Sequence, residues 1–165
     1  GNHTEWIKTD NIPSDRLLID PSSEMLSQIG LKVGRTVEAG ALLIACIAGS
    51  VSSLGRAALT DRRVAFNQQI NAIAPNKDVD SFFLYGLFRI AQTAVQKAAS
   101  DGMKHLLSKS SLENIRLIKP PLERQKEFAD VLVRYERLRA QQREALRQAE
   151  HLFQGLLQAA FRGEV

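Results

Sequence analysis

The sequence predicts an α+β protein, in which a small mixed α/β domain is followed by a long coiled-coil-type α-helix at the C-terminus. Three observations predict this fold class. Two β-prone runs, 41–48 and 56–60, flank a connection rich in Gly and Ser, as in a hairpin. Residues 80–99 carry apolar side chains at steps of three and four, the period of an amphipathic helix. After a double proline, a heptad-like apolar pattern continues almost to the end of the sequence.

The N-terminal part of the domain is expected to begin with a short strand at Trp6 and Ile7, followed by an Asn-Ile-Pro turn. Segment 21–31 then has the pattern of a helix, with Ser22 or Ser23 as its N-cap. We therefore expect a strand, a turn and a helix before the hairpin.

Three further elements are expected between the hairpin and the double proline. Residues 62–75 contain a further strand candidate, with Val64, Phe66, Ile70 and Ile73 as its apolar positions. The amphipathic helix at 80–99 has two candidate N-caps, Asp80 and Ser81. Segment 112–118 is short and apolar, and we expect a turn that leads into a short strand there.

The final helix is expected to begin at the double proline, because Pro121 loses no intrahelical hydrogen bond in a first turn. At about 1.5 Å per residue, forty residues extend for roughly 60 Å, which is more than a small domain can cover. We therefore expect a domain at 1–119 and a helix at 120–165 that pairs with another helix. The residues expected to form the pairing face are Phe128, Val131, Tyr135, Leu138, Leu152 and Leu156.

Composition places the chain among globular proteins, with 44% hydrophobic and 24% charged residues. The longest apolar stretch, 39–48, has about half the length that a membrane span needs, and no signal peptide is visible. The single cysteine, Cys46, lies within that stretch and is expected to be a small buried side chain. A cytoplasmic protein is therefore expected.

The net charge of +4 is distributed unevenly. Residues 1–55 contain four Lys/Arg against six Asp/Glu, whereas residues 56–119 contain ten against five. Residues 120–165 are nearly balanced, at eight against seven. The positive excess in 56–119 is consistent with a surface that faces an anionic polymer, although many soluble domains carry as much.

The sequence contains no motif of a metal or nucleophile site, neither Cys-x-x-Cys, nor His-Glu-x-x-His, nor a glycine-rich phosphate loop. The three histidines, His3, His105 and His151, lie in three separate segments, and no pair of carboxylates stands out. We therefore expect a non-catalytic protein without a metal site or a cofactor.

One basic loop carries side chains of the kinds that contact phosphates and base edges. It contains Lys104, His105, Ser108 and Lys109. A solvated loop between a helix and a strand is an equally good interpretation of the same residues.

A second candidate segment is "RRVAFNQQ". Arg62 and Arg63 suit phosphate or guanine, and the three amides suit adenine. Alternate amides of a strand point to opposite faces, so at least one is expected to be buried and structural. We favour that structural role for Asn67 and Gln68, and a nucleic-acid contact for Gln69.

Three stretches carry a family resemblance: "NQQINAI", the junction "LSKSSLENI…PPLERQ", and the closing "AAFRGEV". In this order the chain resembles one half of the DNA-specificity subunit of a type I restriction-modification system. The resemblance covers nearly the whole chain, and the junction is its most specific part.

The resemblance implies two target-recognition domains, each followed by a long conserved helix, with the two helices packed antiparallel as a spacer. Each domain reads one half of a split site in double-stranded DNA, and the helices dock the methyltransferase (modification) subunits. Here 1–119 would be one target-recognition domain and 120–165 its helix. The second helix is expected from the other half of a longer subunit or from a second copy of the chain, as a homodimer.

Recognition residues vary between members of such a family, so the resemblance points to regions rather than to individual readers. The basic loop is the segment most expected to contact DNA, and the segment "RRVAFNQQ" ranks second. Two further cations are expected to contact the DNA backbone. In that order, the expected DNA-binding residues are Lys104, His105, Ser108, Lys109, Arg62, Arg63, Gln69, Lys97 and Arg56.

Two other functions are also compatible with the sequence. The helix could form a homodimeric coiled coil in a protein-interaction module, which would lack the salt-dependent duplex binding that phosphate contacts cause. The domain could also be the recognition part of a single-chain DNA methyltransferase. The chain itself contains neither a cofactor-binding glycine motif nor an Asn/Asp-Pro-Pro-Tyr/Phe signature.

Overall fold

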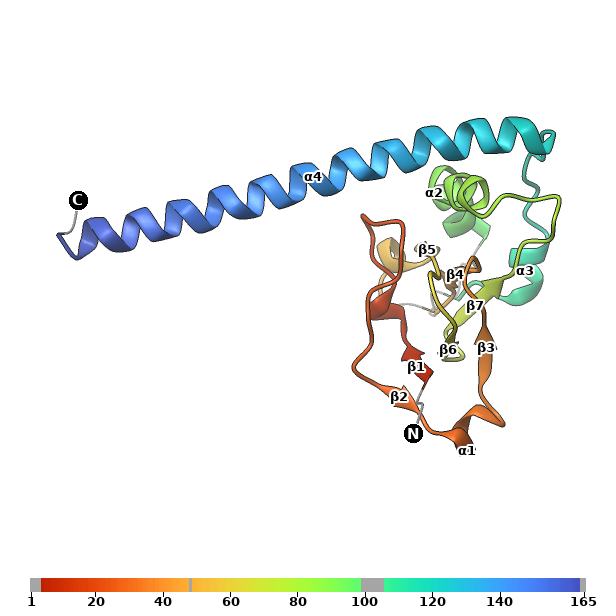
Figure 1. The fold of residues 1–165 in the computed structure, drawn as a ribbon. Helices are drawn as coiled ribbons and strands as arrows, with labels where there is room; N and C mark the ends of the chain where they lie inside the picture. The colour runs from red at the N-terminus through yellow and green to blue at the C-terminus, as the bar shows by residue number, and fades with distance from the viewer. Residues whose placement is uncertain (1–3, 48, 99–105, 164–165) are drawn as a thin grey trace. The chain divides into compact units, whose positions relative to one another are not determined.

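The computed structural model describes residues 4–47, 49–98 and 106–163 (Figure 1). The chain divides into two units, Gly1–Ala129 and Asp130–Val165. The first contains both β-sheets and the second contains most of the final helix. The predicted α+β class, with mixed sheets and a long C-terminal helix, is confirmed.

A four-stranded mixed sheet forms one layer of the first unit, in the order β2-β1-β6-β3. Its strands are β1 (Thr4–Ile7), β2 (Met25–Leu26), β3 (Arg35–Val37) and β6 (Val64–Phe66). β1 and β6 run parallel, and the other two pairings are antiparallel. The predicted strand at Trp6 and Ile7 is confirmed.

A three-stranded antiparallel sheet forms the second layer, in the order β5-β4-β7. It contains β4 (Leu42–Ala45), β5 (Ala57–Leu59) and β7 (Ile70–Ile73). β4 and β5 are the two strands of the predicted hairpin, with Leu43 opposite Ala58.

The main core lies between the two sheets. Leu43 and Ala45 of β4 contribute to it, so Leu42 and Ile44 point to the other face of the sheet. That face is covered by α2 (Ser81–Ala98), which contacts β4 and β5. All four side chains of β4 are therefore buried, at 1% exposure or less.

The predicted amphipathic helix is confirmed as α2, and its N-cap is Asp80. The Asp80 carboxylate accepts hydrogen bonds from the backbone N–H groups of Phe82 and Phe83, at 2.9 and 3.0 Å. A cap that accepts from the second and third N–H groups satisfies donors that the helix itself leaves unpaired.

The predicted helix at 21–31 is largely wrong. Met25 and Leu26 form β2 instead, because they pair with the edge of β1. Only the short α1 (Gln28–Leu31) is helical, and its N-cap is Ser27, not Ser22 or Ser23. The remaining short segments are two 3-10 turns, Thr9–Asn11 and Val51–Ser53.

The single strand predicted within 62–75 is also wrong. The segment forms β6 and β7, which belong to different sheets and are joined by a turn at Asn67–Gln69. β3 was not predicted, because three residues are too few to show a period of two.

The strand predicted after the basic loop is wrong as well. Residues 115–118 are in no strand, and the preceding residues form the short helix α3 (Lys109–Glu113). The Oγ of Ser108 caps α3 by accepting the backbone N–H of Ser111 at 2.9 Å.

The final helix, α4, spans Leu122–Phe161, so it begins one residue after Pro121. Its first two turns belong to the first unit. The fully buried Gln125 amide accepts from the backbone N–H of Asp80 at 2.9 Å and donates to the carbonyls of Asp78 and Pro120, at 3.2 and 2.8 Å. The unit therefore ends later than the expected boundary at 119.

Phe128 also belongs to the first unit. Its ring meets Phe83 edge-on, with the centroids 5.7 Å apart and the planes at 87°. Gly86 leaves room for this ring, since a Cβ there would overlap it. Phe128 is thus packed within the domain, unlike the other five residues expected on the pairing face.

Within the second unit, α4 carries the predicted apolar positions as exposed side chains. Val131, Tyr135, Leu138, Leu152 and Leu156 are between 53% and 65% exposed. In the part of the chain that the structure describes, no helix is both long and apolar enough to cross a membrane. Pairing of this face with a second helix stays a prediction.

Candidate nucleic-acid interface

Three loop segments meet where β4 ends: the connection between β4 and β5, the turn between β6 and β7, and the residues before α3. Cys46 donates its N–H to the carbonyl of Gln69 and accepts from the N–H of Leu107, both at 2.8 Å. Ala45 donates to the carbonyl of Arg56 at 2.9 Å, and Ile47 forms a bridge with Leu106. We call this place, formed by 45–47, 54–56, 67–70 and 106–108, the β4 end.

The last turns of α2 join the β4 end. The side-chain amides of Gln92 and Gln96 donate to the carbonyl of Leu54, at 3.4 and 3.2 Å. Gly55, with a φ of 74°, lies so close to Val95 that a Cβ would be 2.9 Å from it. Three of the expected DNA-binding residues therefore come together here: Arg56, Gln69 and Ser108. Lys97 follows Gln96 in the last turn of α2 and is exposed.

Lys104 and His105 lie outside the residues that the structure describes. The contacts expected of them stay predictions.

Arg56 is half-buried at the β4 end. Its Nε is buried and has no hydrogen-bond partner among the described residues. Buried donors are nearly always paired, because leaving one unpaired costs about 1–3 kcal/mol. Within the described part of the protein, the Nε–H of Arg56 therefore lacks a hydrogen-bond acceptor.

Ser108 and Lys109 have different environments although they are neighbours. The Ser108 hydroxyl caps α3 and lies 2.8 Å from the Oγ of Ser111, so it has a structural role. Lys109 is 80% exposed, with its Nζ 3.6 Å from Glu113. The two residues of this ion pair line a hollow of about 280 Å³ between α3 and β7. Lys109 is the more available of the two for a phosphate.

Arg62 and Arg63 lie at the opposite end of β4, where the backbone of Thr60 bonds Ala41. Arg62 donates to both carboxylate oxygens of Glu5 at 2.7 Å, and this hydrogen bonding holds the pKa of Glu5 below its ordinary value.

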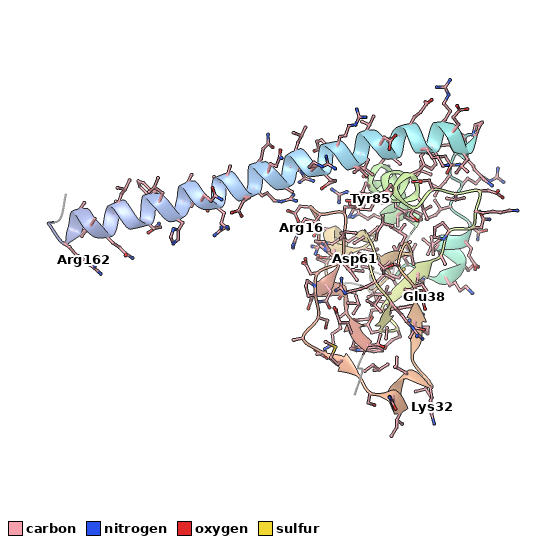
Figure 2. The ribbon with its side chains drawn as sticks, in the orientation of Figure 1. Arg16, Lys32, Glu38, Asp61, Tyr85 and Arg162 are labelled. Carbon is pink, nitrogen blue, oxygen red and sulfur yellow. The ribbon has the colours of Figure 1, made fainter. Side chains whose placement is uncertain are left out.

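Arg63 is exposed, 3.3 Å from Glu38. Asp61 and Glu38, both labelled in Figure 2, pair with Arg62 and Arg63. We call this place, with Glu5, Asp61 and Glu38, the acidic end of β4. The structure therefore does not bring Arg62 and Arg63 together with the other expected residues.

The three amide residues of the turn between β6 and β7, Asn67, Gln68 and Gln69, differ in exposure. Asn67 is buried at 7% exposure, so its predicted structural role is confirmed. Its side chain donates to the Gln69 side-chain oxygen at 3.0 Å and accepts the Gln69 N–H at 3.0 Å. Gln68 is exposed, so a buried structural role is wrong for this residue.

Arg35 is a residue at the β4 end that the sequence did not single out. Its guanidinium donates to the carbonyls of Asn67 and Ile70, at 2.6 and 3.2 Å, and lies over the Phe66 ring, 4.7 Å from the centroid. The only sequence signal was a cation at the start of β3, a strand too short to predict.

Cys46 is buried as expected, at 3% exposure. Burial raises the pKa of its thiol, and the side-chain amide of Asn71 donates to Sγ at 3.2 Å. Among the described residues, no three His, Cys, Asp or Glu side chains are grouped so as to hold a metal ion.

The family model described as the type I restriction modification DNA specificity domain matches residues 6–148. No curated protein matches the chain.

Two solved structures share the fold. One is described as the structural basis of complex assembly and conformational transition of the type I R-M system, with a TM-score of 0.66 and 19% identity over 100% of this chain and 40% of that chain. The other is the HsdS subunit of Thermoanaerobacter tengcongensis, with a TM-score of 0.65 and 19% identity over 100% of this chain and 39% of that chain. The chain thus spans about two fifths of the length of these solved chains.

Proposed function

The chain belongs to the type I restriction modification DNA specificity domain family, and from this premise we propose that it reads a DNA sequence and does not itself catalyse a reaction. The match over residues 6–148 is the observation that carries the proposal. It includes both sheets, α2, α3 and more than half of α4. Within this assignment, the first unit is the target-recognition domain.

The β4 end supports the location of the DNA contact. It gathers Arg35 and Arg56 with the exposed side-chain amide of Gln68, and the exposed Lys97 lies in the last turn of α2, whose Gln96 bonds this end. Such groups are donors that contact phosphates and base edges. At the opposite end of β4, Arg62 and Arg63 lie beside Glu5, Asp61 and Glu38. The carboxylates of those acidic residues repel the phosphates of DNA, so we propose that the DNA lies at the β4 end.

The exposed face of α4 supports the choice of partners. A helix with a sustained apolar stripe is stabilised by packing against other helices. We propose that residues 130–161 pair with the helix of a second half-subunit or a second copy of this chain. The same segment would hold the methyltransferase subunits, in the cytoplasm where the DNA lies.

The proposal predicts duplex binding that weakens steeply with salt, because phosphate contacts release counterions. Reversing the charges of Lys97 and Lys109 together, with Lys97→Glu and Lys109→Glu, should lower the slope of log affinity against log salt by about two. Fluorescence anisotropy with a labelled duplex, from 50 to 200 mM salt, measures this slope.

Lys77→Glu is the matched control, because Lys77 is an exposed lysine that follows β7. β7 runs antiparallel to β4 and ends beside Leu42, the first residue of β4, so Lys77 follows the end of β7 that is remote from the β4 end. It should change the slope by much less than one. A chain that shows no salt-dependent duplex binding would contradict the proposal and favour a protein-interaction module.

A further inference from the structure

We propose that Gln68 reads one A·T base pair in the major groove, from a turn that Asn67 and Arg35 hold in place. The inference rests on the proposed function, and it adds to that function a specific reading residue and a base. It follows from the geometry of the turn, the exposure of its apex and its position at the β4 end.

The turn is fixed by its own first residue. The Ile70 N–H donates to the carbonyl of Asn67 at 3.3 Å, which closes a four-residue β-turn. The Asn67 side chain accepts the Gln69 N–H and donates to the Gln69 side-chain oxygen. Asn at the first position stabilises such turns by this bond two residues on. Both Asn67 and Gln69 are therefore engaged within the turn.

Arg35 braces the turn from the neighbouring strand. One guanidinium nitrogen donates to the carbonyls at both ends of the turn, those of Asn67 and Ile70. The guanidinium also stacks over Phe66, the last residue of β6. A lysine could not reproduce this planar arrangement. The conformation of the turn is thus set by contacts that leave the apex side chain out.

Gln68 is that apex side chain, and it is exposed. A glutamine amide offers both a donor and an acceptor, which match the N7 acceptor and N6 donor of adenine in the major groove. A reader held on an ordered turn loses less conformational freedom on binding than one on a loose loop. Gln69 is the less available of the two amides, because its side chain is partly buried and its oxygen already accepts a hydrogen bond from Asn67.

The surroundings of Gln68 suit the approach of a duplex. The Gln69 carbonyl bonds Cys46 and Ile47, so the turn is part of the β4 end with Arg56. Arg35 places a further positive charge beside the turn. Cations around an amide allow phosphate contacts to set the register while the amide contacts a base edge.

Selection of binding sequences from a random duplex pool tests the inference with the full chain. The wild type should select a sequence with an A·T pair at one position that Gln68→Ala no longer selects. The preference at that position should fall by about five- to 150-fold, while the salt slope of binding is unchanged. Gln68→Glu should shift the preference at that position towards cytosine, whose N4 donates to a carboxylate.

Gln141→Ala is the matched control, since Gln141 is an exposed glutamine on α4 outside the pairing face. It should leave every position of the selected sequence unchanged. If Gln68→Ala selects the same sequence as the wild type, the inference is overturned and the proposed function stands. If the wild type binds duplex DNA without any sequence preference, the proposed function itself fails.

Discussion

Glu5 and Arg62 form a two-point ion pair between β1 and the β5–β6 turn, with both N–O distances at 2.7 Å. The two side chains are 19% and 31% exposed, so solvent screens them only in part. Hydrogen bonding from Arg62 lowers the pKa of Glu5 against the weaker opposing effect of burial. At the scale of single residues, this pair ties two distant parts of the first unit together.

Glu5→Gln should therefore reduce stability in a pH-dependent way. A carboxylate whose folded pKa lies below its ordinary value of 4.5 stabilises the fold above that pH, and the contribution is lost as pH falls through the folded pKa. The variant should lose about 1 kcal/mol of unfolding free energy at pH 7 and much less at pH 3. Urea unfolding at the two pH values measures the difference.

Glu113→Gln is the comparison, because the carboxylate of Glu113 is 64% exposed and 3.6 Å from Lys109. Its effect should be small at both pH values. Equal losses for Glu5→Gln at pH 7 and pH 3 would show that the pair has no electrostatic role.

The Glu5–Arg62 pair also shows why sequence patterns assign side chains poorly. Arg62 stood beside Arg63 and was expected at DNA, but its partner lies 57 positions away in the sequence. Nothing local signals such a partner. Arg35 was overlooked for the same reason, since the carbonyls that it bonds are 32 and 35 positions distant.

At the scale of elements, Gly86 of α2 and Phe128 of α4 fit together. A glycine inside a helix normally costs up to about 1 kcal/mol relative to alanine. At Gly86, a Cβ would overlap the Phe128 ring. The absent side chain therefore lets the start of α4 pack on α2.

Gly86→Ala should destabilise the protein by about 1–3 kcal/mol, the usual range for overpacking. Gly155→Ala is the matched control in α4, because nothing lies within 4 Å of a Cβ there. That change should stabilise the protein by up to about 1 kcal/mol. Urea unfolding of both variants measures the change in unfolding free energy and its sign. Stabilisation by Gly86→Ala would mean that Phe128 is not packed against α2.

Elements with a strong local period were predictable, and elements made by distant pairing were not. The repeating apolar positions of α2 and α4 span many turns, and the hairpin has its own connection. β2, β3, β6 and β7 have two to four residues each and depend on partners elsewhere in the chain. At the candidate site, the regions around Lys97 and Gln69 were predicted, while Arg35 and the exposed Gln68 required the pairing of β3 with β6.

At the scale of the whole molecule, the exposed apolar face of residues 130–161 predicts self-association of the chain. Leu138→Lys combined with Leu152→Lys places two charges on that face, where Leu138 is 59% and Leu152 64% exposed. The wild type should have the solution mass of a dimer or larger species, and the double variant that of a monomer. Light scattering measures both masses.

Gln141→Lys combined with Gln154→Lys adds the same charge at exposed positions outside the face. This control should keep the mass of the wild type. A wild type that is monomeric would show that the face does not pair with a second copy.

Amide hydrogen exchange, measured with and without a duplex selected by the chain, shows whether the β4 end faces DNA. Bound DNA should slow exchange at residues 68–69 and 106–109, which lie in the β6–β7 turn and before and within α3. It should leave residues 61–63, at the acidic end of β4, unchanged. Slower exchange at 61–63 with none at the β4 end would contradict the account.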